Sequence, residues 1–343
     1  MRLAIIVGLA LTALRALAGE DSSPYHLIKS VRVGGDGGFD YVYADAEQRR
    51  LYIPRSTRVT VYDLDTLESK GEITPAPSVH GVAIDAASHH AFCSSQPVVM
   101  WDSRTLNTLK TIPVQGSPDG IFADQATGRI FILSHRAPNV TVIEAATGSI
   151  LGTIDLGGAP EQAVGDGKGR VFIDVEDQAK VAVVDAHALK VTGFYPLGAS
   201  GGTPAGLAID AKNGVLFVAC REPANVVMMR ADSGQVLTSL PIGAGVDAAE
   251  FDPSTLEYFS SQRDGTLTVV KETDPGVFSA EPVVKTKLGA RTSTLDTATH
   301  RILLITADTK PVTDKAPPGQ ATAKRRSAPM VPGSFTILMV GRN

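Results

Sequence analysis

A unit of four short apolar runs, repeated at a nearly constant spacing, constrains this chain more than any other feature. Each copy has a first run ending in Asp, a turn, a β-branched and aromatic run, a second turn, and a run such as VTVYD or VAVVD. A fourth run follows in six copies. The first-run aspartates lie 39 to 44 residues apart, at Asp45, Asp85, Asp124, Asp166, Asp210, Asp252 and Asp296. Four antiparallel strands at this period are typical of a β-propeller blade.

Seven such units predict an all-β fold, a seven-bladed β-propeller with four antiparallel strands per blade. The seventh unit ends at FTILMVGRN and lacks a fourth strand, while a spare strand, HLIKSVRVGG, precedes the first unit. We therefore expect the N-terminal strand to close the last blade, which would leave no unpaired edge there. All-β folds of this size often form one domain, so residues 19–343 are predicted to be a single propeller.

The first 18 residues have the layout of a secretory signal peptide. Arg2 precedes a short apolar core, and Ala16-Leu17-Ala18 matches an A-x-A cleavage site. The core is too short to anchor the protein in a bilayer. We expect residues 1–18 to be removed and the mature protein to be exported, to the periplasm or outside the cell. Without Arg2 and Arg15 the net charge is about −6, which argues against wholesale wrapping by nucleic acid.

The segment NVTVIEAATGSILGTIDLGGAP resembles the repeat of the YncE-like (YVTN-repeat) family of exported seven-bladed propellers. The resemblance covers Asp21 to Asn343. It implies the propeller fold and a periplasmic or secreted location. It also implies single-stranded nucleic acid as a candidate partner, because that activity is associated with YncE-like propellers. The repeat consists of strand and turn residues, so it indicates a fold more than an activity.

Several polar residues have a structural interpretation. The repeated aspartates are predicted to shape hairpin turns, because an Asp side chain bonds nearby backbone N–H groups. Four histidines fall in turns on the opposite face and are predicted to be solvated: His89, His90, His187 and His300. Cys93 and Cys220 lie three blades apart, too far for a disulfide, and are predicted to be free, buried thiols.

The strongest functional signal is a set of residues five positions before the repeated aspartates. The loops that enter the innermost strands of a propeller converge on one mouth of its central channel. Six of these seven positions are ionisable, although Asp, Glu, Lys and Arg make up only 20% of the chain. The seven are Asp40, His80, Asp119, Glu161, Ala205, Asp247 and Arg291. The loops after the second strands bring His135, Arg221 and Arg263 to the same mouth, with Arg55 and Arg136.

The predicted ligand site consists of nine of these residues: Asp40, His80, Asp119, His135, Glu161, Arg221, Asp247, Arg263 and Arg291. Their chemistry leaves several interpretations open. Clustered carboxylates repel each other unless cations compensate. One interpretation is a metal or cationic ligand near Asp40, His80 and Asp119, with His135 as a further ligand. Another is a polar small-molecule pocket with acids on one side and Arg221 and Arg291 on the other. The residues could also be merely solvated. The sequence alone assigns no metal ligand and identifies no cofactor.

A proline-rich segment interrupts the seventh unit. Residues 309–333 contain five prolines and the cluster Lys324-Arg325-Arg326, and they lack apolar periodicity. This composition predicts a mobile insertion in blade 7. The insertion could cover the mouth, dock an anionic partner, or be tolerated without a role.

Together these features predict a monomeric, exported module that binds a small molecule or a protein partner at the mouth. The alternative is an enzyme, because seven-bladed lactonases and lyases share this architecture and work at the same mouth. In that case His80, Glu161 and Arg291 would polarise or protonate a small polar substrate. The spacing shows no Ser-His-Asp arrangement and no nucleophile.

Overall fold

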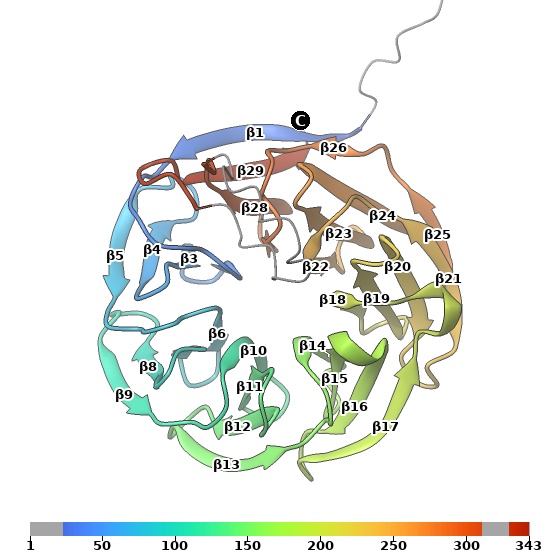
Figure 1. The fold of residues 1–343 in the computed structure, drawn as a ribbon, viewed down its shortest axis with the longest axis horizontal. Coiled ribbons are helices and arrows are strands. Elements are labelled where there is room, and N and C mark those ends of the chain that lie inside the picture. Colours follow the sequence, from blue (N-terminus) through green and yellow to red (C-terminus); the bar gives the residue numbers. More distant parts are fainter. Residues whose placement is uncertain (1–22, 311–328, 343) are drawn as a thin grey trace, which may run out of the picture.

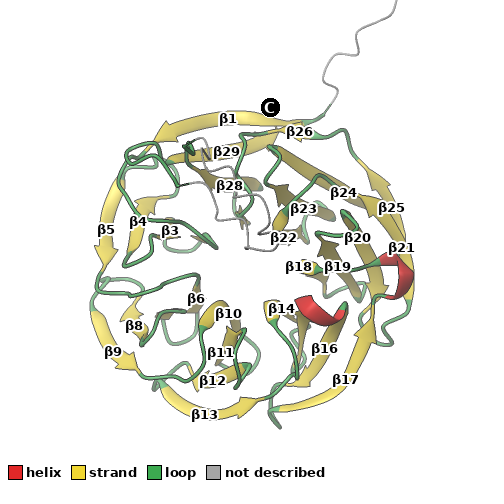
Figure 2. Ribbon diagram, viewed as in Figure 1, coloured by secondary structure: helices red, strands yellow, loops and turns green. Residues whose placement is uncertain are grey.

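The computed structural model describes residues 23–310 and 329–342, which form a ring of seven β-sheets around a central channel (Figure 1). In every sheet the strands pair antiparallel with their neighbours. Helical structure in these residues is limited to two short 3₁₀ segments, η1 (Glu176–Gln178) and η2 (Gly198–Ser200) (Figure 2). The prediction of an all-β, seven-bladed propeller with four-stranded blades is confirmed.

Blades 1 to 4 each run outward from the channel in chain order. Their strands are β2 (Tyr43–Asp45), β3 (Arg50–Pro54), β4 (Val59–Asp63) and β5 (Ser69–Ile73); β6 (Val82–Asp85), β7 (His90–Cys93), β8 (Val98–Asp102) and β9 (Thr108–Ile112); β10 (Pro118–Asp124), β11 (Arg129–Ser134), β12 (Val140–Glu144) and β13 (Ser149–Ile154); and β14 (Pro160–Gly165), β15 (Arg170–Val175), β16 (Lys180–Asp185) and β17 (Lys190–Pro196).

Blades 5 to 7 follow the same plan with two additions. Their strands are β18 (Pro204–Asp210), β19 (Val215–Cys220), β20 (Asn225–Arg230) and β21 (Val236–Pro241); β22 (Val246–Asp252), β23 (Glu257–Gln262), β24 (Thr266–Asp274), β25 (Val277–Ala280) and β26 (Val284–Lys285); and β27 (Ser293–Asp296), β28 (Arg301–Thr306), β29 (Thr336–Arg342) and β1 (Tyr25–Arg32). The short β26 pairs with β24 beside β25. In blade 7, β1 pairs antiparallel with β29, so the outermost strand comes from the N-terminal side of the chain (Figure 1).

The apolar core lies between the blades. The second and third strands of a blade are buried on both faces, as in β11 and β12, because each face packs against a neighbouring blade. Trp101 of β8, for example, is fully buried and contacts Tyr52 of β3 with ring centroids 5.9 Å apart. Burial of each such side chain contributes about 1.5–3 kcal/mol, so the blades hold the inner strands in a firm frame.

The repeated aspartates have the predicted structural role. Asp210 Oδ1, at the end of β18, accepts hydrogen bonds from the backbone N–H groups of Lys212 (2.9 Å) and Asn213 (3.1 Å). Asp45 makes the same kind of turn after β2, and Asp252 after β22. These carboxylates define the first hairpin of each blade, and they also fix the register from which the mouth residues are counted.

Other side-chain predictions have mixed outcomes. Cys93 and Cys220 are free and buried, as predicted. Two of the turn histidines are not simply solvated, because they contact the neighbouring blade. His300 Nδ1 lies 2.7 Å from Asp252 Oδ2, and His90 Nδ1 lies 2.8 Å from the carbonyl oxygen of Ala145.

Two predicted segments lie outside the described residues. They are the signal peptide, residues 1–18, and the cluster Lys324-Arg325-Arg326. Beside the second gap, Thr309 forms an isolated bridge with Met330. Within the described part of the chain, no helix has the length and apolar character needed to cross a membrane.

Candidate functional site

Eight of the nine predicted site residues meet at one mouth of the channel. Six come from the loops that enter the inner strands or from the first residues of those strands, and two follow second strands. In the order of their contacts around the mouth they are Asp40, His80, Asp119, His135, Glu161, Arg221, Asp247 and Arg291. Acids and bases alternate around this closed circle, the mouth ring, and every blade contributes at least one member.

One side of the mouth ring, the histidine half, consists of His80, Asp119 and His135. His80 Nδ1 lies 2.8 Å from Asp40 Oδ2 and 3.3 Å from Asp119 Oδ1. His135 Nε2 lies 3.4 Å from Asp119 Oδ2 and 2.9 Å from Glu161 Oε2. The two histidine side chains are 38% and 39% exposed, so this half is open to a ligand from solvent.

The other side, the arginine half, consists of Arg221, Asp247 and Arg291. Both arginines pair with the buried Asp247. Arg221 also reaches Glu161, with its Nη2 2.9 Å from Oε1, while Arg291 Nη2 lies 3.6 Å from Asp40 Oδ1. Asp40 and Glu161 therefore join the two halves.

Blade 5 explains how the arginine half closes. Its loop position carries Ala205, whose small, buried side chain offers no charge. Arg221 of the same blade spans this position and links Glu161 of blade 4 to Asp247 of blade 6. It also pairs with Glu176. One guanidinium thus contacts three carboxylates, which is possible because its donors form a rigid planar fork.

The groups of the histidine half have shifted pKa values. A hydrogen bond with Glu161 raises the pKa of His135 to about 9, and one with Asp40 raises the pKa of His80. Burial raises the pKa of Asp119 to about 6. Burial also acts to raise the pKa of Glu161, but His135 and Arg221 outweigh it, and that pKa is lowered. His135 is therefore a cation at neutral pH.

The arginine half responds to pH in another way. Burial acts to lower the pKa of Arg221 and of Arg291, but attraction to Asp247 and the other nearby acids outweighs it and raises both. Burial raises the pKa of Asp247, against the opposing effect of the two arginines. Guanidinium groups stay charged at all physiological pH values, so this half is a permanent ionic cluster.

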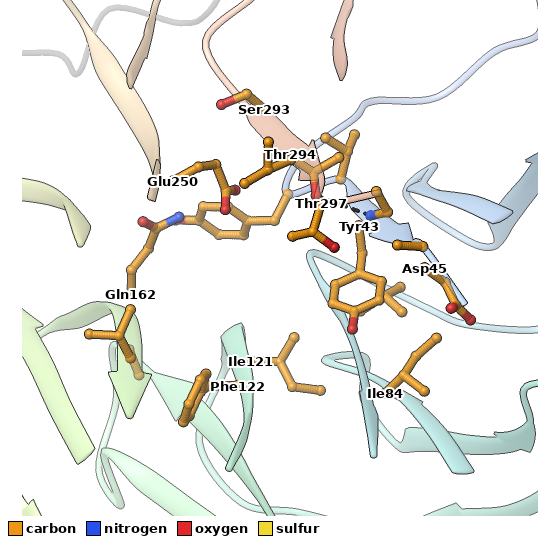
Figure 3. Close-up of a pocket in the computed structure, with 18 of the residues that line it drawn as sticks. Tyr43, Asp45, Ile84, Ile121, Phe122, Gln162, Glu250, Ser293, Thr294 and Thr297 are labelled. Carbon is orange, nitrogen blue, oxygen red and sulfur yellow. Dashed lines mark hydrogen bonds between the residues drawn. The ribbon is translucent and has the colours of Figure 1, made fainter. Parts of the chain in front are cut away.

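A cavity of about 550 Å³ extends along the channel below the mouth ring, lined by the inner strands of all seven blades. Figure 3 shows Tyr43, Glu250, Gln162 and Thr294 projecting into it from different blades. The Oε1 atom of Gln162 already has a partner in the protein, because it accepts a hydrogen bond from the backbone N–H of Leu207 at 2.9 Å. The volume lies within the range of small-molecule sites, roughly 300–1,000 Å³.

Two functional candidates of this cavity escaped the sequence prediction. Burial raises the pKa of Tyr41, and so do the charges of the ring acids, Glu161 foremost. Tyr41 lines the cavity together with Glu161 of the mouth ring. Burial raises the pKa of Glu250 to about 8, with no compensating partner. The sequence could have indicated Glu250, because it is a charged residue among the apolar residues of the predicted strand between Asp247 and Asp252.

Three predicted mouth arginines lie outside the ring. Arg263 is exposed and forms no ion pair among the described residues; burial and the nearby Arg291 lower its pKa. Arg55 contradicts the prediction. It is 1% exposed, donates to the carbonyl oxygen of Asp36 at 2.6 Å, and stacks on Phe335. Arg136 is exposed and likewise has no ion pair in residues 23–310 and 329–342. Loop position alone did not distinguish these side chains from Arg221 and Arg291.

Comparisons with known proteins support the fold. No family model matches the chain, and no curated protein sequence matches it. Among solved structures, 1728 chains are similar, so this fold is too widespread to select a function. One of them, titled "Crystal Structure of Mitotic Checkpoint Complex", is similar with a TM-score of 0.71 and 10% identity, over 89% of this chain and 95% of that chain. At that identity the similarity shows the fold alone.

Proposed function

We propose that this protein is an exported, YncE-like propeller that acts as a binding module and takes a small polar ligand at the mouth ring. The observation that carries the proposal is the closed circle of eight ionisable side chains, one or more from every blade, above a cavity of about 550 Å³. The fold itself suits a binding module, because propellers commonly bind at this mouth.

The charged side chains of the mouth ring are not needed to hold the seven blades together. The apolar contacts between blades already hold the propeller together, and buried ion pairs add little to stability compared with apolar residues of similar volume. A set of partly exposed charges gathered around one opening is better suited to recognition. The four carboxylates favour a ligand with a cationic or donor group, and Arg221 and Arg291 can meet an acidic group. A single-stranded nucleic acid would meet the same four carboxylates, so its phosphates fit this mouth poorly.

The test is a thermal-shift screen of the mature protein with small cationic, anionic and zwitterionic compounds. Arg291→Ala alters the mouth ring, and Arg58→Ala is the matched control because its ion pair with Asp36 is on the surface. A compound that binds at the mouth raises the Tm of the wild type and of Arg58→Ala, but not that of Arg291→Ala. Equal shifts in all three proteins, or no shift with any compound, would reject the proposal.

One observation favours a second function, a lactonase-like hydrolase or lyase. Asp119 lies between two histidines and has a pKa of about 6, close to the working range of a general acid or base. The chemistry would be proton transfer to or from a small polar substrate held by Arg291. A panel of lactones tests it, with turnover rising as the pH passes about 6 in the wild type and absent in Asp119→Asn. Turnover that survives in Asp119→Asn would exclude this function.

A further inference from the structure

The histidine half of the mouth ring has the donor atoms and the spacing of a divalent-metal centre. We infer that Asp119 bridges two first-row divalent cations. One cation is held with Asp40 and His80, and the other with His135 and Glu161. In each group of three, the ligand atoms lie within 4.8 Å of one another. This inference rests on the proposed function, because it names what one half of the binding mouth takes.

The orientation of Asp119 is the main evidence. Its two oxygens face different histidines, with Oδ1 3.3 Å from His80 Nδ1 and Oδ2 3.4 Å from His135 Nε2. A carboxylate that bridges two ions presents one oxygen to each of them. Ligand atoms of a tetrahedral zinc ion, at about 2.0–2.1 Å from the metal, are about 3.3–3.4 Å from each other. Both spacings match this value.

The flanking acids are arranged to support the same centre. Asp40 directs Oδ2 toward its histidine at 2.8 Å, while Oδ1 lies 3.6 Å from Arg291. Glu161 directs Oε2 toward its histidine at 2.9 Å, while Oε1 lies 2.9 Å from Arg221. In each acid one oxygen shares a hydrogen bond with a histidine nitrogen, at a place where a bound ion would take the position of the shared proton, and the other oxygen faces an arginine. Such outer contacts hold metal ligands in place in known metal sites.

The donor chemistry narrows the choice of ion. Each site offers one imidazole nitrogen and two carboxylate oxygens, a mixed set that suits Zn²⁺ or Mn²⁺ better than Mg²⁺ or Ca²⁺. With three protein ligands per ion, a fourth position is left for water or for a group of the bound ligand. The arginine half then lies beside the ions, where it can hold an anionic part of that ligand.

A histidine–aspartate pair on the opposite face of the propeller provides a comparison, because it has no third residue, within the part of the chain that the structure describes, that could bind a metal ion. His300 Nδ1 lies 2.7 Å from Asp252 Oδ2, as close as His80 to Asp40. Among the described residues, no third His, Cys, Asp or Glu completes a group there. His300→Ala is therefore a matched control, since it removes a histidine–carboxylate pair without touching the mouth.

The experiment is a Zn²⁺ titration of the chelator-treated mature protein by isothermal calorimetry. We expect two Zn²⁺ per wild-type chain, two for His300→Ala, and one each for His80→Ala and His135→Ala. Asp119→Ala should weaken both sites at least tenfold. X-ray absorption of the zinc-loaded wild type needs no variant, and should show a Zn–Zn distance of roughly 3.5–4 Å.

Fewer than two zinc ions in the wild type, unchanged binding in both mouth variants, or no Zn–Zn distance in this range would overturn the inference. Its failure is distinguishable from that of the proposed function. If zinc does not bind but a small compound still gives a Tm shift that Arg291→Ala removes, the metal centre is wrong and the binding mouth stands. If neither binds, both are wrong.

Discussion

The histidine half and the arginine half of the mouth ring are built from equivalent loops of different blades, yet their chemistry differs. Both place acids at the same positions of the repeat, but the bases between them are imidazoles in one half and guanidiniums in the other. Guanidiniums stay charged and hold the more deeply buried acid, Asp247, in a fixed cluster. Imidazoles can give up a proton and present a lone pair. The comparison indicates that the arginine half is a frame and the histidine half is the exchangeable part.

Removal of Arg221 should give the largest effect. It would leave Asp247, Glu161 and Glu176 without a shared partner, and two of these acids are buried. Breaking a buried ion pair costs about 3–5 kcal/mol, so Arg221→Ala should lower the free energy of unfolding by that amount in urea denaturation. Arg136→Ala is the control and should change it by less than about 0.5 kcal/mol. A loss from Arg221→Ala no larger than the control's would mean that the arginine half is not a structural frame.

The pH dependence of stability should separate the two halves. The pKa of His135 is about 9 in the folded protein and about 6.5 when unfolded, so the folded state binds this proton more tightly. Its contribution is therefore complete below about pH 6.5 and is lost as the pH rises through about 9. We expect about 1–2 kcal/mol, because the exposed side chain is partly screened by solvent.

The measurement compares wild type with His135→Gln by urea unfolding in a chelator, from pH 6 to pH 10. The difference in the free energy of unfolding should shrink as the pH rises through 9. For the matching variant of the other half, Arg221→Lys, the difference should stay constant between pH 6 and 9. A constant difference for both variants would contradict the division into a fixed and an exchangeable half.

Substitution of Glu250 should change the stability of the protein least. This acid differs from those of the mouth ring because no basic side chain in the described part of the chain compensates its burial. Its pKa of about 8 lies well above the unfolded value, so the folded state is penalised increasingly as the pH rises from about 4.3 to 8. Glu250→Gln should therefore stabilise the protein by about 1 kcal/mol at pH 8.5, reduced by water in the channel, and hardly at pH 5. Thermal unfolding at the two pH values measures this. A variant no more stable at pH 8.5 than at pH 5 would show that Glu250 is compensated.

The sequence predicted the blades and most of the mouth, for a physical reason. The repeated aspartates make the same turn in each blade, so a fixed offset from Asp45 or Asp210 identifies a fixed backbone position. The sequence did not predict which residue each mouth side chain contacts, because these contacts involve neighbouring blades that are distant in sequence. Arg221 crosses the position of Ala205, while Arg55, from a similar loop, turns onto Phe335. His300 likewise finds Asp252 of another blade. No local pattern separates these outcomes.

Native mass spectrometry of the protein, purified without chelators, shows whether the mouth ring holds a ligand in the protein as isolated. We expect a mass above that of the denatured chain, in a fixed ratio of ligand to protein. The excess should persist in His300→Ala and be lost from a protein that carries both His80→Ala and His135→Ala. A bare chain at the calculated mass, or an excess that survives in the double variant, would contradict the claim that the histidine half of the mouth ring is a ligand site.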